Sequence, residues 1–345
     1  MKPPIFNGTT SRTIVKQGLV LTKSGAGFEA EGVLNPAVIE HDGSIHMFYR
    51  ALAEGNRSTI GYARLDTPLT VEYRANYPVL FPETAEESQG VEDPRIVKID
   101  DTFFLTYTAY DGHNALGALA TSTDLKGFVK YGVIAPHIGS REFAAAAKKC
   151  GDAHVKYFRL DQSSPLMWDK NLVFFPRKIL GKFALLHRIR PGIQLALMDD
   201  PREIPPGYWG DYFREFTSHI VMDPKFEHEM SYLGPGCPPI ETPEGWLIIY
   251  HSVFDTIEGY VYVACAALLD LQDPTKEIAR LPYPLFVPDR EYERHGEVNN
   301  VCFPTGTILR HGKLYIYYGA ADDKIACASV KMQELINELK ATRIP

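Results

Sequence analysis

The sequence contains no cluster of lysine and arginine residues, and its formal net charge is −7 at pH 7. A nucleic-acid-binding protein needs a basic surface, so we expect no nucleic-acid partner. No apolar run reaches the roughly 18 residues that a membrane helix requires, so we expect no membrane partner either. The first residues, MKPPIFNGTTSRT, lack the apolar core of a secretory signal. These absences predict a cytoplasmic protein, although a periplasmic protein whose signal had been removed would look the same.

Cysteine is scarce and irregularly spaced. The five cysteines are an odd number, and no two of them have the Cys-x-x-Cys spacing of a metal or redox motif. Buried, reduced thiols are therefore the expected state. No other metal-ligand spacing occurs, so we predict neither a metal site nor a cofactor. The cysteines are Cys150, Cys237, Cys265, Cys302 and Cys327.

Aromatic residues, in contrast, are plentiful, with 19 tyrosines and 18 phenylalanines. Such a composition is typical of β-rich proteins and of sugar-binding surfaces. Five segments share one pattern, in which a short apolar strand and a tight polar turn precede an apolar or aromatic strand. Turns such as His-Asp-Gly-Ser and Arg-His-Gly-Lys are typical of β-hairpins, because glycine accepts a positive φ. The segments are 36–51, 94–109, 172–188, 238–252 and 304–320.

A longer repeat surrounds each hairpin. A third strand-like run follows every hairpin, and in four cases a fourth run follows as well. Recurring units of four antiparallel strands are typical of a β-propeller. Five copies predict an all-β fold, a five-bladed β-propeller that occupies residues 1–345 as a single domain. We expect the early strand 14–23 to complete the last blade, and residues 331–342 to form a short C-terminal helix.

The segment 137–168 is an insertion between the second and third units. It contains a run at 143–150, FAAAAKKC, which we expect to be helical or part of a lid. Long insertions in compact rings are often functional. This one is either a cover for the functional site or a surface decoration.

The propeller topology predicts where functional residues meet. The first strand of each blade lines the central channel, and the hairpin returns the second strand to the same rim. Residues before the first strand and after the second therefore converge at one mouth, where carboxylates, cations, amides and aromatic rings gather. These residues include Asn35, Arg50, Glu92, Asp93, Arg95, Lys170, Asn171, His187, Arg188, Glu227, Glu229, Tyr232, His251, Phe303 and Asp322.

The residue types at this mouth suit a sugar, so we expect these residues to contact the substrate, Glu92 and His187 included. Acids, amides, Arg and His hydrogen-bond to neighbouring hydroxyls, and aromatic rings stack on the C–H face of a sugar ring. Cleavage of a glycosidic bond needs a general acid and, on the opposite face, a base or an incoming anion. Simpler explanations remain open for single residues. Asp93 could shape a turn before Pro94, Arg95 could be paired with Glu92, and His251 could be an ordinary core histidine.

Four motifs, in this order, resemble glycoside hydrolase family 130. They are GVEDPRI at 90–96, FPRKILGKFALLHR at 175–188, GPGCPPIETPEGWLIIYH at 234–251 and YYGAAD at 317–322. That family comprises β-mannoside phosphorylases and β-1,2-mannosidases on a five-bladed propeller. The resemblance covers about 33–330, so it implies the same fold and a β-mannoside oligosaccharide as the substrate. It leaves the oligomeric state open, a homo-oligomer included.

The resemblance also implies roles for single residues. Asp93 is implied to be the general acid, acting partly through a hydroxyl of the mannose in subsite −1. Sugar contacts are implied for Asn35, Arg50, His251, Tyr262, Phe303 and Asp322.

The group that attacks the sugar depends on the cations near the acid. The resemblance implies three phosphate-binding cations in the phosphorylases: an Arg before Asn171, the Arg of the His-Arg pair, and a Lys at the start of the third motif. Here Lys170 replaces the first, Arg188 keeps the second, and Tyr232 stands in place of the lysine. Losing a fixed cation weakens a phosphate site.

Two glutamates just upstream of Tyr232 are candidates for activating water instead. They are Glu227 and Glu229, although this segment could also be a solvated edge. We therefore predict an inverting exo-β-1,2-mannosidase that hydrolyses β-1,2-linked manno-oligosaccharides to mannose. Asp93 would be the acid, and either glutamate would be the base.

A β-mannoside phosphorylase that produces mannose 1-phosphate is the alternative. It would use inorganic phosphate as a co-substrate and bind it with Lys170, Arg188 and either Arg177 or Lys178. A sugar-binding propeller without catalysis is a remote alternative.

Overall fold

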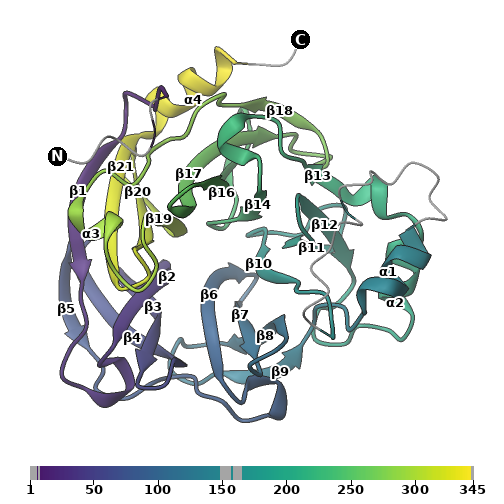
Figure 1. Ribbon diagram of the computed structural model, residues 1–345, viewed down its shortest axis with the longest axis horizontal. Coiled ribbons are helices and arrows are strands. Elements are labelled where there is room, and N and C mark those ends of the chain that lie inside the picture. The colour runs from purple at the N-terminus through teal and green to yellow at the C-terminus, as the bar shows by residue number, and fades with distance from the viewer. Residues whose placement is uncertain (1–5, 7, 148–156, 158–164, 343–345) are drawn as a thin grey trace.

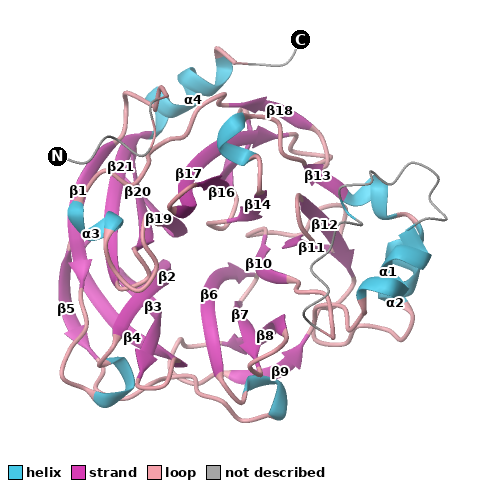
Figure 2. Ribbon diagram, in the orientation of Figure 1, coloured by secondary structure: helices cyan, strands magenta, loops and turns pink. Residues whose placement is uncertain are grey.

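The computed structural model describes residues 6, 8–147, 157 and 165–342 of the 345-residue chain. Strands make up most of its regular structure (Figure 2), as expected for an all-β fold. Within these ranges no helix is long and apolar enough to span a membrane.

The strands form five groups along the chain. The first contains β2 (Gly32–His41), β3 (Ser44–Ala53), β4 (Arg57–Thr67) and β5 (Thr70–Arg74). The second contains β6 (Gly90–Ile99), β7 (Thr102–Tyr110), β8 (Ala115–Ser122) and β9 (Val129–Val133). The third contains β10 (Lys170–Phe174), β11 (Phe183–Arg188), β12 (Ile193–Met198) and β13 (Ile220–Met222).

The last two groups complete the set. The fourth contains β14 (Tyr232–Pro235), β15 (Ile240–Thr242), β16 (Gly245–Thr256), β17 (Gly259–Leu269) and β18 (Glu277–Arg280). The fifth contains β19 (Cys302–Arg310), β20 (Lys313–Ala320), β21 (Lys324–Lys331) and the N-terminal β1 (Val15–Leu21). A single parallel pairing, between Ser58 and Gly90, joins the first two groups into one sheet.

The five predicted hairpins are all present as antiparallel pairs. In the first turn, Asp42 and Gly43 both have positive φ angles, of 49° and 77°. His311 and Gly312 do the same in the last hairpin, at 50° and 73°. Two consecutive positive φ angles match the right-handed twist of the flanking strands, which explains why these residues occupy the turns.

The groups stand around a common centre (Figure 1). Strands β2, β6, β10, β14 and β19 lie nearest to it, and β2 contacts both β6 and β19, while β10 contacts both β6 and β14. The N-terminal strand β1 pairs with β21, from Val15 opposite Ser329 to Leu21 opposite Ile325. The prediction that this strand completes the last group is therefore confirmed.

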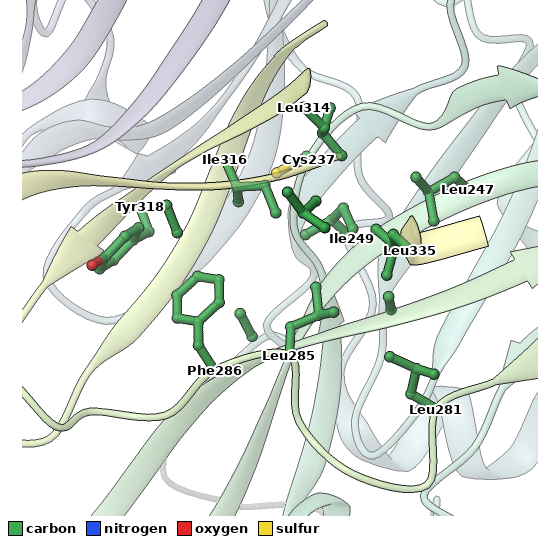
Figure 3. Packing of buried hydrophobic residues seen from close by; sticks show 14 of the residues in the cluster. Cys237, Leu247, Ile249, Leu281, Leu285, Phe286, Leu314, Ile316, Tyr318 and Leu335 are labelled. Atoms are coloured by element: carbon green, nitrogen blue, oxygen red, sulfur yellow. The ribbon is translucent and has the colours of Figure 1, made fainter. Parts of the chain in front are cut away.

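Apolar side chains fill the spaces between adjacent groups. In the cluster of Figure 3, Leu247 and Ile249 of β16 pack with Ile316 of β20. Helix α4 (Met332–Lys340) covers this cluster with the fully buried Leu335, and it lies within the predicted helix at 331–342. Burying an aliphatic side chain of this size stabilises the fold by about 1.5–3 kcal/mol. Packing between groups thus fixes the inner strands against one another.

The insertion at 137–168 begins with helix α1 (Ser140–Ala147), which starts earlier than the predicted run at 143–150. Residues 148–150 and most of the remaining insertion lie outside the described ranges, so its role as a cover stays a prediction. The Phe143 ring packs edge-on against Phe213 of α2 (Tyr208–Arg214), with 5.4 Å between the ring centroids. Helix α1 is therefore held beside the third group.

Short helical turns precede four of the inner strands. They are η1 (Gly27–Glu29), η2 (Ala85–Glu87), η6 (Glu227–Glu229) and the four-residue helix α3 (Glu291–Arg294), and a further turn, η5 (Phe216–His219), follows α2. The cysteines in the described ranges are free and buried, as predicted; they are Cys237, Cys265, Cys302 and Cys327, whereas Cys150 lies outside these ranges.

Candidate active site

Three inner strands place an Asn or Asp at a β-bulge near their first residues. Register shifts interrupt the pairing of β2, β6 and β10 with their neighbours. Asn35, Asp93 and Asn171 lie at these shifts with φ angles of 48°, 49° and 63°. Apart from glycine, Asn and Asp adopt this left-handed conformation more readily than other residues. Because a bulge re-aims a side chain, all three can line one pocket at the centre.

That pocket has a volume of about 160 Å³ and receives side chains from all five strand groups. The predicted site residues that line it are Asn35, Arg50, Asp93, Lys170, Asn171, Arg188, Tyr232, Tyr262, Phe303 and Asp322. Trp168, Arg190 and Val301 line it as well, and none of these was predicted from the sequence.

Asp93 lies at the cationic centre of the pocket. Asn35 donates from Nδ2 to Asp93 Oδ1 at 2.7 Å, and NH1 of Arg50 lies 3.6 Å from the same oxygen. Burial acts to raise the pKa of Asp93, but Arg50, Lys170 and Arg95 together outweigh burial and lower it. The carboxyl group is therefore ionised in the free protein at neutral pH.

Glu92 serves Arg50 and does not line the pocket. Its Oε1 accepts a hydrogen bond from Arg50 NH2 at 2.7 Å, while Ser58 Oγ accepts one from Arg50 Nε at 2.8 Å. These two bonds fix the guanidinium with NH1 toward Asp93. The structure thus gives Glu92 a positioning role in place of the predicted sugar contact.

Asp322 is the second carboxyl group of the pocket, in the turn after β20. Burial raises its pKa to about 6, Asp93 adds to this increase, and Arg50 opposes it. The two carboxyl groups therefore have pKa values pushed in opposite directions, a usual arrangement where two acids have different tasks. Asp322 takes up a proton first as the pH falls.

Arg188 forms the opposite, cationic side. Its Nε and NH2 atoms are buried without a hydrogen-bond partner, and both polar side-chain atoms of Asn171 lack one too. Burial, together with the nearby Arg190, lowers the pKa of Arg188 to about 10. In the described part of the chain, no carboxylate lies within ion-pair distance of Arg188 or Lys170. Buried polar groups are normally paired, so this side is suited to a ligand with several acceptor atoms.

Arg190 is a pocket residue that sequence reasoning missed. Its guanidinium carbon lies 3.9 Å from the centroid of the Tyr232 ring, and that of Arg188 lies 5.0 Å from the same centroid. Arg190 follows Arg188 by two residues, and alternate residues of an extended chain point to the same side. That spacing is the signal that identifies it.

An aromatic wall completes the pocket. The hydroxyls of Tyr232 and Tyr262 are 2.7 Å apart, and Phe303 lies beside them. His251 does not line the pocket but packs behind Phe303, with 4.3 Å between the ring centroids. Burial and the charge of Arg188 keep the pKa of His251 well below its ordinary value, so this ring is neutral.

His187 was predicted to contact substrate, but it points away from the pocket. Its Nδ1 lies 2.7 Å from Asp169 Oδ2, and its Nε2 lies 2.7 Å from the hydroxyl of Tyr212. Tyr212 belongs to α2, so His187 fastens that helix to the third group.

Arg95 is likewise structural. It donates from NH1 to the backbone carbonyls of Asp93 and Pro94, both at 3.0 Å, and from Nε to the carbonyl of Gly236. These bonds hold the bulge that presents Asp93 and tie it to the fourth group.

Arg177 and Lys178, the two alternative phosphate ligands, also lie outside the pocket. Arg177 is exposed and donates to Glu241 at 2.7 Å, and Lys178 lies 4.0 Å from Asp100. Neither residue lines the pocket.

Glu229, a predicted base, belongs to a motif that recurs in four strand groups. In each, a buried glutamate before the inner strand accepts a hydrogen bond from a tyrosine on the second strand and pairs with a cation on the outermost strand. We call this motif the Glu–Tyr–cation triad. The triads are Glu29–Tyr49–Arg74, Glu87–Tyr107–Lys130, Glu229–Tyr250–Arg280 and Glu293–Tyr318–Lys16.

The triad fixes the orientation of Glu229. Its Oε1 accepts from the Tyr250 hydroxyl at 2.6 Å, and its Oε2 lies 3.1 Å from NH1 of Arg280. Glu227 is exposed and lines a separate hollow beside Phe226 and Phe254. The structure therefore does not bring either glutamate to the pocket that contains Asp93.

The triad predicts different outcomes for the two glutamates. Glu229→Gln should lower the free energy of unfolding by about 1–3 kcal/mol, because it removes one of the two carboxylates that pair with the buried Arg280 and leaves only Glu277. Glu227→Gln is the matched control and should stay within about 0.5 kcal/mol of the wild type. Urea unfolding followed by fluorescence measures both. The reverse ranking of the two variants would contradict the structural role of Glu229.

The site is of the kind that handles carbohydrates, with two carboxyl groups and an aromatic wall on a β-sheet scaffold. Comparisons with known proteins identify the family within this class. The model of glycoside hydrolase family 130, described as β-1,4-mannooligosaccharide phosphorylase, matches residues 14–341. A 1,2-β-oligomannan phosphorylase from Thermoanaerobacter sp. (strain X514) is 32% identical over 329 residues, which cover 92% of this chain and 96% of that protein.

Two further relatives agree with this assignment. A β-1,2-mannobiose phosphorylase from the same Thermoanaerobacter strain is 32% identical over 327 residues, which cover 89% of this chain and 93% of that protein. The structure of a β-1,2-mannobiose phosphorylase from Listeria innocua superposes with a TM-score of 0.74 at 23% identity, covering 95% of this chain and 99% of that one. The last likeness shows a shared fold.

This chain belongs to glycoside hydrolase family 130, as its motifs predicted. Members of the family are enzymes that act on mannosides.

Proposed function

We propose that the protein is a β-1,2-mannoside phosphorylase. It would transfer the terminal mannosyl group of a β-1,2-linked manno-oligosaccharide to inorganic phosphate. One observation carries this proposal: Arg188 lies buried at the pocket with two unpartnered guanidinium nitrogens, beside Lys170 and the unpartnered Asn171. A phosphate ion offers several acceptor oxygens and the negative charge that these groups lack.

The cations are arranged asymmetrically around the acid. Arg50 is already neutralised by Glu92 and lies close to Asp93, so it has little capacity left for an added anion. Arg188 and Lys170 have no such partner among the described residues. Phosphate is therefore expected on the Arg188 side, and the sugar between phosphate and Asp93.

This placement defines which bonds form and which break. A phosphate oxygen attacks C1 of the mannosyl group and forms the new C1–O bond, while the bond between C1 and the glycosidic oxygen breaks. The leaving oxygen receives a proton that originates from Asp93, in part through a sugar hydroxyl. The products are mannose 1-phosphate and an oligosaccharide shorter by one mannose. Attack from the face opposite the leaving group inverts the β configuration to α.

Bound phosphate also favours protonation of Asp93. Lys170 is one of the cations that lower the pKa of Asp93 in the free protein. An anion beside Lys170 offsets part of this positive field and raises the pKa of Asp93, so the carboxyl group holds a proton at a higher pH. No further cofactor enters this reaction.

The hydrolase that we predicted from the sequence receives less support. It required Glu227 or Glu229 as a base, and neither lines the pocket. The named relatives are phosphorylases. Tyr232 in place of a lysine remains the one feature that favoured hydrolysis.

We further propose that the five strand groups are the blades of a five-bladed propeller. The Glu–Tyr–cation triads support this, because they place equivalent residues at equivalent positions in four groups. Lys16 supports it most directly. It lies on β1, in the fifth group, and takes the place that Arg74 of β5, Lys130 of β9 and Arg280 of β18 have in the other three triads.

Product analysis on β-1,2-mannobiose, with and without phosphate, tests the proposed function. We expect mannose and mannose 1-phosphate in equal amounts with phosphate, and negligible turnover without it. β-1,4-Mannobiose serves as the linkage control and should react more slowly. Release of two free mannose molecules at the same rate in both buffers would identify a hydrolase instead.

A further inference from the structure

We propose that Arg190, stacked on Tyr232, contacts the incoming phosphate and supplies the cation that Tyr232 does not. This inference rests on the proposed phosphorolysis and names a specificity-determining residue of that site. The sequence motifs alone suggested that one phosphate-binding cation is missing from this chain. The structure indicates that the charge has moved from the inner strand β14 to the segment after β11.

Arg188 and Arg190 both lie beside Tyr232. Both guanidinium groups approach the Tyr232 ring, at 5.0 Å and 3.9 Å from its centroid. All three residues line the pocket that contains Asp93. The Tyr232 ring therefore holds two cations on the same side of the pocket, where a planar guanidinium stacks well on an aromatic face.

Arg190 has no counter-charge among the described residues. Several other arginines are paired with acids: Arg177 with Glu241, Arg202 with Asp200 and Arg310 with Glu40. The exposed Arg12 and Arg57 have no such partner among the described residues, but they do not line the pocket. Arg190 is exposed, and within the described ranges no carboxylate lies at ion-pair distance from it. An arginine kept near a second arginine, and near no acid, is suited to an anion that comes from outside.

Arg188 and Arg190 repel each other. Arg190 helps to lower the pKa of the buried Arg188, second only to burial itself. An anion between the two guanidinium groups would relieve this repulsion and accept hydrogen bonds from both. Arginine is suited to such a role because its fork of N–H donors matches two phosphate oxygens at once.

Steady-state kinetics of Arg190→Ala tests the inference, with phosphate varied at saturating β-1,2-mannobiose. We expect the KM for phosphate to rise about tenfold or more, because a charge-assisted contact is lost. The KM for β-1,2-mannobiose should change less than twofold. Arg190→Lys, which keeps the charge without the fork, should lie between the wild type and the alanine variant. Arg202→Ala is the matched control, since Arg202 is exposed and pairs with Asp200 outside the pocket.

The outcomes separate this inference from the proposed function. If wild-type turnover needs phosphate but Arg190→Ala has an unchanged KM for phosphate, the inference is overturned and the proposed function stands. If wild-type turnover does not need phosphate, both fail together. An equal rise of both KM values would also overturn the inference, because it would indicate a general distortion of the pocket. Unchanged thermal unfolding of Arg190→Ala would confirm that the exposed side chain is not needed for folding.

Discussion

Replacing Asp93 with asparagine should lower kcat by about 10²–10⁴-fold, the usual contribution of a general acid. Asparagine keeps the size of the side chain and its contacts with Asn35, but it has no proton to give to the leaving oxygen. Substrate affinity should change far less than kcat, because Arg50 and Asp322 remain at the pocket. Rapid-mixing kinetics with β-1,2-mannobiose and phosphate measures both quantities.

Two comparisons separate acid catalysis by Asp93 from a structural role. An aryl β-mannoside with a good leaving group needs little protonation, so Asp93→Asn should lose much less activity on it. Asp323→Asn is the matched control, since Asp323 adjoins the site but pairs with Lys324 and does not line the pocket. Equal losses on both substrates would count against Asp93 as the acid.

Replacing Arg188 with methionine should have the second-largest effect, a rise of about 100-fold or more in the KM for phosphate. The same variant should be more stable than the wild type. Burial and the nearby Arg190 lower the pKa of Arg188 to about 10, and this decrease corresponds to roughly 3 kcal/mol against the buried charge at neutral pH. A neutral side chain of similar length removes this cost.

Thermal unfolding with added phosphate links the two effects. Phosphate should raise the Tm of the wild type, because a ligand that binds only the folded state stabilises it. It should leave the Tm of Arg188→Met nearly unchanged. Arg95→Met is the contrasting variant: Arg95 is equally buried and its pKa is likewise lowered to about 10, but three backbone carbonyls would lose the hydrogen bonds that it donates. Its loss should destabilise the protein, and a stabilised Arg95→Met would contradict this division of roles.

The fold was predictable because its signals are local. Positive φ angles at Asp42-Gly43 and His311-Gly312 follow from residue type, and they define hairpins without any knowledge of the rest of the chain. The pairing of β1 with β21 followed from counting strands, since one group lacked its fourth member.

The residues of the site were predictable only where the strand topology alone determines which way a side chain points. Asn35, Asp93 and Asn171 lie at the starts of inner strands, and those starts converge in any such arrangement. The orientation of a side chain one position away is set by packing instead. His187 precedes Arg188 directly, yet it points to Asp169 and Tyr212 because successive residues of a strand face opposite sides.

Comparison of the repeated units reveals the role of Glu229, which we had predicted as a candidate base. Glu229 was one of two candidate bases when its segment was read alone. Compared with the other units, it has nearly the same spacing to a tyrosine as Glu29 and Glu87, at 21 residues against 20 and 20, while Glu293 lies 25 residues from its tyrosine. A glutamate at an equivalent place in several units is more economically explained by the shared fold than by chemistry at one site. Alignment of the repeats would have assigned Glu229 to the triad before the structure was known.

The central claim is that a phosphate oxygen attacks C1 of the mannosyl group. Mass spectrometry of the products formed from β-1,2-mannobiose and fully ¹⁸O-labelled phosphate tests it most directly. We expect mannose 1-phosphate that retains every labelled oxygen, with one labelled phosphate consumed for each glycosidic bond broken. Labelled phosphate that stays entirely inorganic while free mannose accumulates would contradict it.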